Sequence, residues 1–430
     1  MTSEPTEPLS AGAAPSPPLV TRTVEVPDPG PLLDLLPPDA DPRRVSAWVR
    51  GGDGIVGWGR VRWLTTSGPD RFTEAEQWWR QQVRHAVVRD EVGLPGTGPV
   101  AFGSFAFADA STAGGALVIP QVMVGRREGR CWVTTTGAGT DLPPRDRPNR
   151  ATPPPAPAGV EFADGALGDD AYAAAVASAV ERIGAGEVDK VVLARDLRVR
   201  AGDPIDPRWL LEALAGRYAN TWVFAVDGLV GATPEMLVRL ERGLVTSRVL
   251  AGTIRRSGDD ERDLALAASL ARSSKDLEEH EYAVRSVADA LRPHCTSLNA
   301  PESPFVLHLR NVMHLATDVA GVLADGATSL ALAGGLHPSA AVCGTPREVA
   351  GRMIGELEGM DRGRYAGPVG WMDASGDGEW GIALRCGSYE RQDRMRLFAG
   401  CGIVSGSDPA AELAESEAKL VPMRDALTPS

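Results

Sequence analysis

Hydrophobic and polar positions follow two periods along the chain, and together they predict a mixture of strands and helices. Aliphatic and β-branched residues dominate 189–200 (DKVVLARDLRVR) and 221–226 (TWVFAV), as in buried strands. The segment 235–256 reads as two strands with a turn near Arg242-Gly243. Helical spacing, an acidic start and closing glycines predict a helix over 168–186.

The rest of the chain repeats this mixture. In its first third, strand-like runs at 54–64 (GIVGWGRVRWL) and 116–124 (ALVIPQVMV) flank a helical stretch at 72–88. A long helical region follows at 259–294, and short strands alternate with helices from 368 onward. Hairpins combined with long helices favour an α+β fold over a doubly wound sheet.

Length and composition leave the number of domains open. A chain of 430 residues forms one large domain or two of ordinary size. Residues 1–20 are acidic and rich in proline, which predicts a disordered tail and not a secretory signal, so a cytoplasmic protein is expected. Clustered prolines at 141–160 predict a linker or a long connection.

Charge and cysteine usage exclude several classes of function. The five cysteines form no CxxC pair and the six histidines no HExxH or HxH spacing, which argues against a disulfide framework and zinc catalysis. A net charge of −13 disfavours nucleic-acid and anionic-membrane partners. A small anionic substrate would need cations gathered locally.

Acidic residues recur on one face of two predicted helices. In the first, Asp276 and Glu279 are three residues apart; the second carries Glu412, Glu415 and Lys419 at i, i+3 and i+7. Carboxylates from two facing helices suit Mg²⁺, which prefers oxygen ligands. The alternative is a solvated charged face, a common pattern on helix surfaces.

Several charged or polar residues interrupt apolar segments. Lys190 is either a charge at a strand end or a base carried into a site. Arg385 offers a bidentate fork for a carboxylate or forms a structural ion pair. Glu235, after a proline, is an exposed turn residue or a general acid whose pKa is raised by apolar surroundings. His314 and His337 are isolated and fit core hydrogen-bonding roles. Composition and spacing specify no reaction.

Nine segments, taken in order, resemble the chorismate-utilising enzymes related to anthranilate synthase component I, and most closely the isochorismate synthases. They are DKVVLAR, GATPEMLV, SRVLAGTIRR, SSKDLEEHEYAV, NVMHLATDV, LHPSAAVCGTPR, DRGRYAGPVGWMD, EWGIALRC and LFAGCGIVSGSDPAAELAESEAKL. They span about 189–420, over half of the chain.

The resemblance implies a role for each matching residue. Lys190 matches the base that activates water and Glu235 the general acid. Glu279 and Glu415 match the two Mg²⁺ ligands, which Asp276 and Glu412 support through water. The positions that match contacts to the substrate chorismate are Gly252, Thr253, His314, Ala341, Tyr365, Arg385, Gly402 and Lys419. Of these, Tyr365 and Arg385 match residues that hold the side-chain carboxylate.

The implied reaction converts chorismate into isochorismate with Mg²⁺ as cofactor. Water adds at ring carbon C2 and the C4 hydroxyl leaves. A lysine base requires burial, because an apolar cleft favours the neutral amine. The lysine indicates water and not ammonia as the nucleophile, since the anthranilate-type relatives lack it. Salicylate synthases keep the lysine but place threonine where this chain has Ala341. Here the usual Thr-Pro-Ala reads Ser339-Ala340-Ala341.

Salicylate synthase, which goes on to eliminate pyruvate, is therefore the alternative enzyme, and a catalytically inactive chorismate-binding protein is the alternative outside catalysis. The resemblance also implies a monomer with one α+β fold, in which two large antiparallel sheets pack together under outer helices. Residues 21–428 would then be one domain, with an N-terminal part (21–140), a connection (141–160) and a catalytic part (161–428). The composition favours menaquinone over siderophore synthesis as the pathway.

Overall fold

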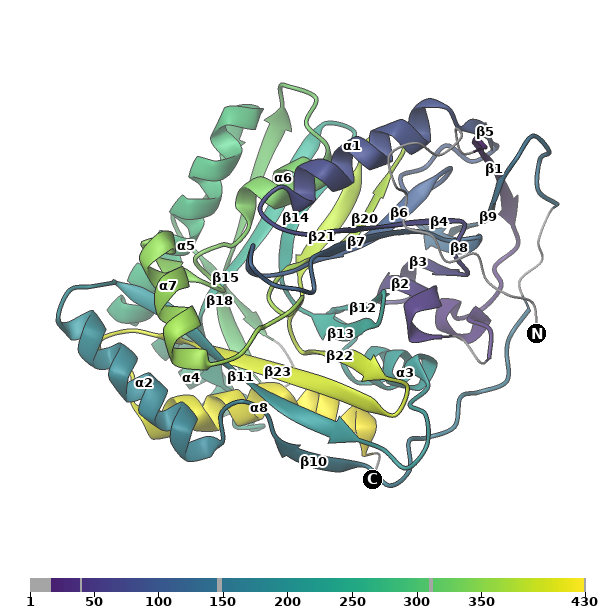
Figure 1. Cartoon of the computed structure of the whole chain (residues 1–430). Helices are drawn as coiled ribbons and strands as arrows, with labels where there is room; N and C mark the ends of the chain where they lie inside the picture. Colours follow the sequence, from purple (N-terminus) through teal and green to yellow (C-terminus); the bar gives the residue numbers. More distant parts are fainter. Residues whose placement is uncertain (1–16, 39–40, 145–148, 309–311, 429–430) are drawn as a thin grey trace.

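The computed structural model describes residues 17–38, 41–144, 149–308 and 312–428. Within them the chain forms two large, mostly antiparallel sheets that pack face to face, with helices on the outside (Figure 1). The predicted α+β fold with two packed sheets is confirmed. None of the described helices is long and apolar enough to span a bilayer.

One sheet has 13 strands among the described residues. Their spatial order is β10 (Glu161–Asp164), β11 (Lys190–Arg200), β23 (Arg394–Ile403), β22 (Cys386–Arg391), β13 (Leu229–Thr233), β12 (Trp222–Val226), β2 (Val45–Arg50), β3 (Asp53–Trp58), β8 (Val122–Arg127), β9 (Arg130–Ala138), β1 (Leu19–Val26) and β5 (Val87–Asp90), with β19 (Gly344–Thr345) beside β11. Only the pair β1–β5 is parallel within the described part of this sheet.

The other sheet has 10 strands among the described residues. Their order is β16 (Cys295–Asn299), β18 (Val312–Leu323), β15 (Leu244–Arg255), β14 (Met236–Glu241), β21 (Gly378–Ile382), β20 (Pro368–Asp373), β6 (Val100–Phe105), β7 (Gly115–Ile119) and β4 (Arg62–Thr66), with β17 (Phe305–His308) beside β18. The predicted turn at Arg242-Gly243 joins β14 to β15 and is confirmed.

Helices cover the outer faces of both sheets (Figure 1). They are α1 (Arg71–Arg84), α2 (Asp169–Gly184), α3 (Pro207–Arg217), α4 (Asp260–Leu270), α5 (Ser274–Leu291), α6 (Ser329–Leu336), α7 (Arg347–Glu358) and α8 (Pro409–Leu427). The main core lies between the sheets and includes Trp48, Phe102, Phe224 and Trp380. A second apolar cluster packs α3 and α8 against the 13-stranded sheet.

Two predicted strand-like runs each divide between the sheets. The run 54–64 becomes β3 and β4, and the run 116–124 becomes β7 and β8. Gly59 at the first break has φ +73°, a conformation that favours glycine. Pro120 at the second break has no N–H to give to a strand ladder. Both breaks therefore carry the chain from one sheet to the other.

The predicted helical region 259–294 is also divided. α4 ends at Leu270 and α5 starts at Ser274, because the Ser273 hydroxyl accepts a hydrogen bond from the backbone N–H of Asp276. This cap fixes the orientation of α5, which carries Asp276 into the site described below.

The predicted tail is wrong at its last two residues. Leu19 and Val20 begin β1, where both are buried and pair with β9. Residues 1–16 lie outside the described part of the chain.

Both sheets combine strands from before and after the proline-rich segment. β2 pairs with β12 in one sheet and β6 with β20 in the other. The described residues of 141–160 form neither helix nor strand. That 21–428 forms one domain remains a prediction, to which the Discussion returns.

Candidate active site

One small cavity gathers the predicted site residues. It has a volume of about 150 Å³ and lies where β11 and β23 of one sheet meet β15 and β18 of the other, beside α5 and α8. Every predicted residue whose side chain the structure describes lines it: Lys190, Glu235, Gly252, Thr253, Asp276, His314, Ala341, Tyr365, Arg385, Gly402, Glu412, Glu415 and Lys419. Glu279 lies on α5, but its side chain is outside the described part.

Lys190 is buried at the first position of β11. Its relative exposure is 7%, and its backbone pairs with Thr345 of β19. Strand alternation places Val192 on the same face, and it lines the same cavity, while Val191 packs into the main core. Lys190 is therefore not an exposed charge at a strand end, and it has the burial that a base requires.

Glu235 is buried between Pro234 and the start of β14. Its relative exposure is 6%, so the alternative of an exposed turn residue does not hold. The backbone carbonyl of Glu235 accepts a hydrogen bond from Ile382 N–H, which holds this turn against β21. Burial raises the pKa of the Glu235 carboxyl to about 8, although the cations Arg385, Lys190 and Lys419 oppose the shift. The group is a protonated acid at neutral pH.

His314 faces Thr253 across the β15–β18 ladder. Thr253 Oγ1 and His314 Nδ1 are 3.0 Å apart, and burial lowers the pKa of the imidazole to about 3. The ring is thus neutral. Its Nε2 atom is buried and has no hydrogen-bond partner among the described residues, so a polar group in the cavity could pair with it.

Gly252 interrupts the β15–β18 register beside His314. Its φ is +77°, and a Cβ atom there would lie 3.1 Å from Cβ of Asp276. Glycine therefore allows α5 to approach the strand and brings the Asp276 carboxylate to the cavity wall.

α8 supplies the other acidic residues from the opposite side. The Asp408 carboxylate caps this helix by accepting from Ala411 N–H, and the predicted face of Glu412, Glu415 and Lys419 points to the cavity. Lys419 Nζ lies 2.7 Å from Glu415 Oε1 and donates to the Gly400 carbonyl at 2.8 Å. This face lines the cavity and is partly buried, with 13% of the Lys419 side chain and 32% of the Glu415 side chain exposed.

The charges on α8 stabilise one another. Burial alone would raise the pKa of Glu415, but the neighbouring Lys419 ammonium outweighs it and lowers the pKa. Potential ligand atoms of Glu412, Glu415 and Cys401 lie within 4.8 Å of one another. The two carboxylates, with Asp276 on the same cavity, form an oxygen-rich set that fits a hard cation such as Mg²⁺.

Arg385 and Tyr365 line the cavity near Lys419. Arg385 has no ion-pair partner among the described residues, so these residues give no support to the alternative of a structural ion pair. Tyr365 stacks on Phe398 with ring centroids 5.1 Å apart, and burial raises the pKa of its hydroxyl to about 12. A Cβ atom at Gly400 would lie 3.0 Å from the Tyr365 hydroxyl, so glycine leaves this hydroxyl its position.

The sequence did not predict the buried pair Glu358–Arg362 behind the site. Arg362 donates to the carbonyls of Val192 and Val342 at 2.7 and 2.9 Å, and Glu358 accepts from Ala194 N–H at 2.7 Å. The pair thus fixes β11 and the Ala341 loop, two walls of the cavity. Glutamate and arginine spaced i, i+4, with the arginine as the first residue of RGRYAG, were the available signal.

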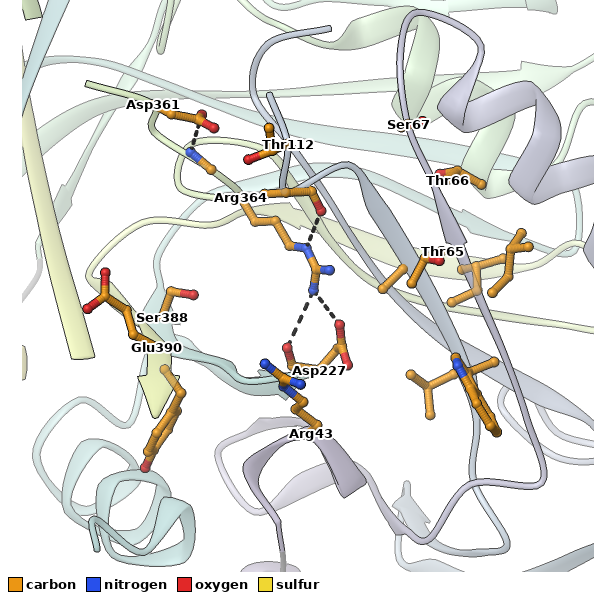
Figure 2. A pocket seen from close by; sticks show the side chains of 18 of the residues that line it. Arg43, Thr65, Thr66, Ser67, Thr112, Asp227, Asp361, Arg364, Ser388 and Glu390 are labelled. Carbon is orange, nitrogen blue, oxygen red and sulfur yellow. Dashed lines mark hydrogen bonds and ion pairs between the residues drawn. The ribbon is translucent and has the colours of Figure 1, made fainter. Parts of the chain in front are cut away.

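A larger cavity of about 710 Å³ contains none of the predicted site residues (Figure 2). Figure 2 shows Arg364 pointing to Asp227, with Nη1 2.8 Å from Oδ2, and Arg60 also pairs with Asp227. Several cations of this cavity are thus already neutralised by acidic neighbours. Size alone does not identify the active site.

Three comparisons place the chain among known proteins. The family model described as chorismate binding enzyme matches residues 20–428. The isochorismate synthase MenF of Bacillus subtilis is 32% identical over 409 residues, covering 87% of this chain and 85% of that protein. The isochorismate synthase DhbC of the same organism is 40% identical over 268 residues, covering 60% and 67%.

Solved structures show the same similarity. The structure of DhbC from Bacillus anthracis matches with TM-score 0.75 and 31% identity, covering 92% of this chain and 98% of that one. MenF from Escherichia coli, at TM-score 0.79 and 24% identity, covers 96% and 95% and shares the fold. The resemblance predicted from the nine segments is confirmed.

Proposed function

The chain belongs to the chorismate-binding enzyme family, and we propose that it is an Mg²⁺-dependent isochorismate synthase. The observation that carries the proposal is that a buried lysine and a buried, protonated glutamic acid line one cavity, together with the cations Arg385 and Lys419. Hydration at one ring carbon with loss of hydroxyl from another needs one base and one acid, and Lys190 and Glu235 have the chemistry for these two roles.

In the proposed reaction the amine of Lys190 takes a proton from water as the water oxygen bonds to C2 of chorismate. The ring double bonds shift, the C4–O bond breaks, and Glu235 gives its proton to the departing hydroxyl. Water is consumed and released once each, so the product is an isomer. With a pKa of about 8, Glu235 still carries this proton at neutral pH, which an ordinary glutamate would not.

Cations in the cavity would bind the two carboxylates of the substrate. Arg385 provides a planar fork for one of them, beside the Tyr365 hydroxyl. Lys419 and the backbone at Gly402 would bind the other carboxylate. Bound Mg²⁺ would supply positive charge near that carboxylate, held by Glu279 and Glu415 with Asp276 and Glu412 in support.

The remaining wall would position the ring. Thr253, through its contact with His314, leaves the unpartnered Nε2 of His314 for a substrate hydroxyl or carboxylate. Gly252 contributes backbone contacts. Ala341 leaves space at the position where salicylate synthases, like the amine-adding enzymes, carry threonine.

Two alternatives differ in outcome. A salicylate synthase would also eliminate pyruvate, and Ala341 favours isochorismate as the final product. An inactive binding protein would not need the acid, base and carboxylate positions filled, as they are here. We further propose menaquinone synthesis as the pathway, with siderophore synthesis second, and a cytoplasmic monomer.

Incubation of the purified protein with chorismate and Mg²⁺, followed by NMR of the products, tests the proposal. We expect isochorismate alone, in equilibrium with chorismate. Lys190→Met, which keeps the length of the side chain, should reduce turnover at least 100-fold because the base is lost. Salicylate with pyruvate, or no turnover, contradicts the proposal; full activity of Lys190→Met contradicts the assigned base only.

A further inference from the structure

A second hollow adjoins the catalytic cavity. It has a volume of about 290 Å³ and shares Pro234 and Arg385 with the active site. Its other walls come from the end of α3, the loop before β12, β13, the residue after β15, the end of β17, and α8. They include Arg217, Arg256, His308 and Pro422. We call this hollow the arginine vestibule.

The vestibule is lined by one sign of charge. Arg217, Arg256 and Arg385 contribute three formal positive charges, and none of the described lining residues is acidic. The 710 Å³ cavity differs, because its wall includes Asp227, Asp361 and Glu390. An acid-free hollow is unexpected on a chain whose net charge is −13.

The acidic partners of these arginines lie outside the lining. Arg256 Nε donates to Asp263 at 2.7 Å, and the side chain of Asp263 is 4% exposed. Arg217 Nη1 lies 3.8 Å from Asp425. Arg385, at the junction of the two cavities, has no ion-pair partner among the described residues.

We propose that the arginine vestibule collects small dicarboxylates from solution and passes them to the active site through Arg385. This inference rests on the proposed function, which makes the substrate a dianion. A concave wall of one charge concentrates counter-ions locally and raises their association rate, and added salt screens the effect. The vestibule thus offsets the repulsion that the negative net charge exerts on the substrate.

A charge series at Arg217 tests the proposal, because this residue lies at the end of α3, is 32% exposed and lines only the vestibule among the cavities described. In Arg217→Lys, Arg217→Gln and Arg217→Glu, kcat/KM is measured from low to high ionic strength. At about 20 mM salt we expect Gln to reduce kcat/KM about three- to ten-fold and Glu more, with Lys near wild type; all should converge by about 0.5 M. kcat should stay constant.

Arg80→Gln and Arg80→Glu are the matched controls. Arg80 is also an arginine paired with an acid, but it lies on α1 and is 63% exposed. His308→Glu adds one negative charge to the same vestibule from β17 and should lower kcat/KM about as much as Arg217→Gln, which also changes the charge by one unit.

Equal salt dependence of kcat/KM in the Arg80 and Arg217 series would overturn the proposed role of the vestibule. A loss of kcat/KM in the Arg217 series that persists at high salt would do the same. Failure of the wild-type protein to convert chorismate would instead refute the proposed function, so the two failures are distinguishable.

Discussion

The carboxyl of Glu235 links the stability of the protein to pH. Its pKa of about 8 when folded exceeds the ordinary value of 4.5, so the folded state retains a proton that the unfolded chain releases. The stability from this proton is fully present below pH 4.5 and is lost as pH rises to 8, by about 1.4 kcal/mol per unit.

Glu235→Gln should therefore stabilise the protein increasingly with pH while abolishing catalysis. Near pH 4.5 we expect similar free energies of unfolding; at pH 8 the variant should be more stable by about 3–5 kcal/mol, since glutamine stays neutral. Urea unfolding across this range measures the difference, and turnover should fall at least 100-fold. A constant difference between pH 4.5 and 8 would contradict the raised pKa.

The sequence was sufficient to predict which residues form the site, but not the surroundings of their side chains. Strand alternation and the family motifs identified Lys190 and Glu235. Whether Glu235 was an exposed turn residue or a buried acid depended on β21 and the cavity around it, which are distant in sequence. Arg362 was missed because its spacing from Glu358 does not show that the pair is buried, and its other partners, the carbonyls of Val192 and Val342, leave no side-chain pattern.

At the scale of elements, the pair Glu358–Arg362 takes the place of a neighbouring strand beside β11. It forms hydrogen bonds with the carbonyl of Val192 and the N–H of Ala194. These positions of β11 directly follow Lys190 and Val191, which pair with β19. Arg362→Gln should leave a buried carboxylate unpaired and destabilise the protein by about 3–5 kcal/mol. Because Val192 and the Ala341 loop would shift, kcat should also fall about ten- to 100-fold.

Arg208→Gln is a control for this prediction, because Arg208 is also buried and paired, with Asp206, but lies outside the catalytic cavity. It should lower the melting temperature with little effect on kcat. If both variants lose kcat equally at a temperature where both are folded, the pair has no specific role in positioning β11.

The types of the elements were predictable, whereas their breaks were less so. Apolar periodicity found β11, β14 and β15, but it did not divide 54–64 or 116–124 between sheets. Gly59 and Pro120 mark those breaks, and each is also compatible with a bulge or an edge strand in one sheet. Only the pairing of β3 with β8 and of β4 with β7 decides between these options.

At the scale of the whole molecule, the order of strands was not derivable from local pattern. β2 lies beside β12, and β6 beside β20, although more than 170 residues separate each pair. Such pairings depend on which apolar faces can be buried together, as Trp48 of β2 is against Trp222 and Phe224 of β12. The family resemblance, and not periodicity, implied two packed sheets.

We propose from this topology that residues 21–428 fold as one cooperative unit. A fragment starting at residue 161 would expose the edges of β12 and β20 that β2 and β6 cover. Unpaired edges and the apolar core between them favour aggregation, so this fragment alone should be insoluble. Calorimetry of the full chain should give a single transition, with equal calorimetric and van't Hoff enthalpies.

Co-expression provides the matched control. Fragments ending and starting within 141–160 should reassemble into an active complex, since both sheets can form again without a covalent connection and the described part of this segment contributes no strand. Two separate transitions in the full chain, or a soluble and folded 161–428 fragment, would show instead that the proline-rich segment joins two independent domains.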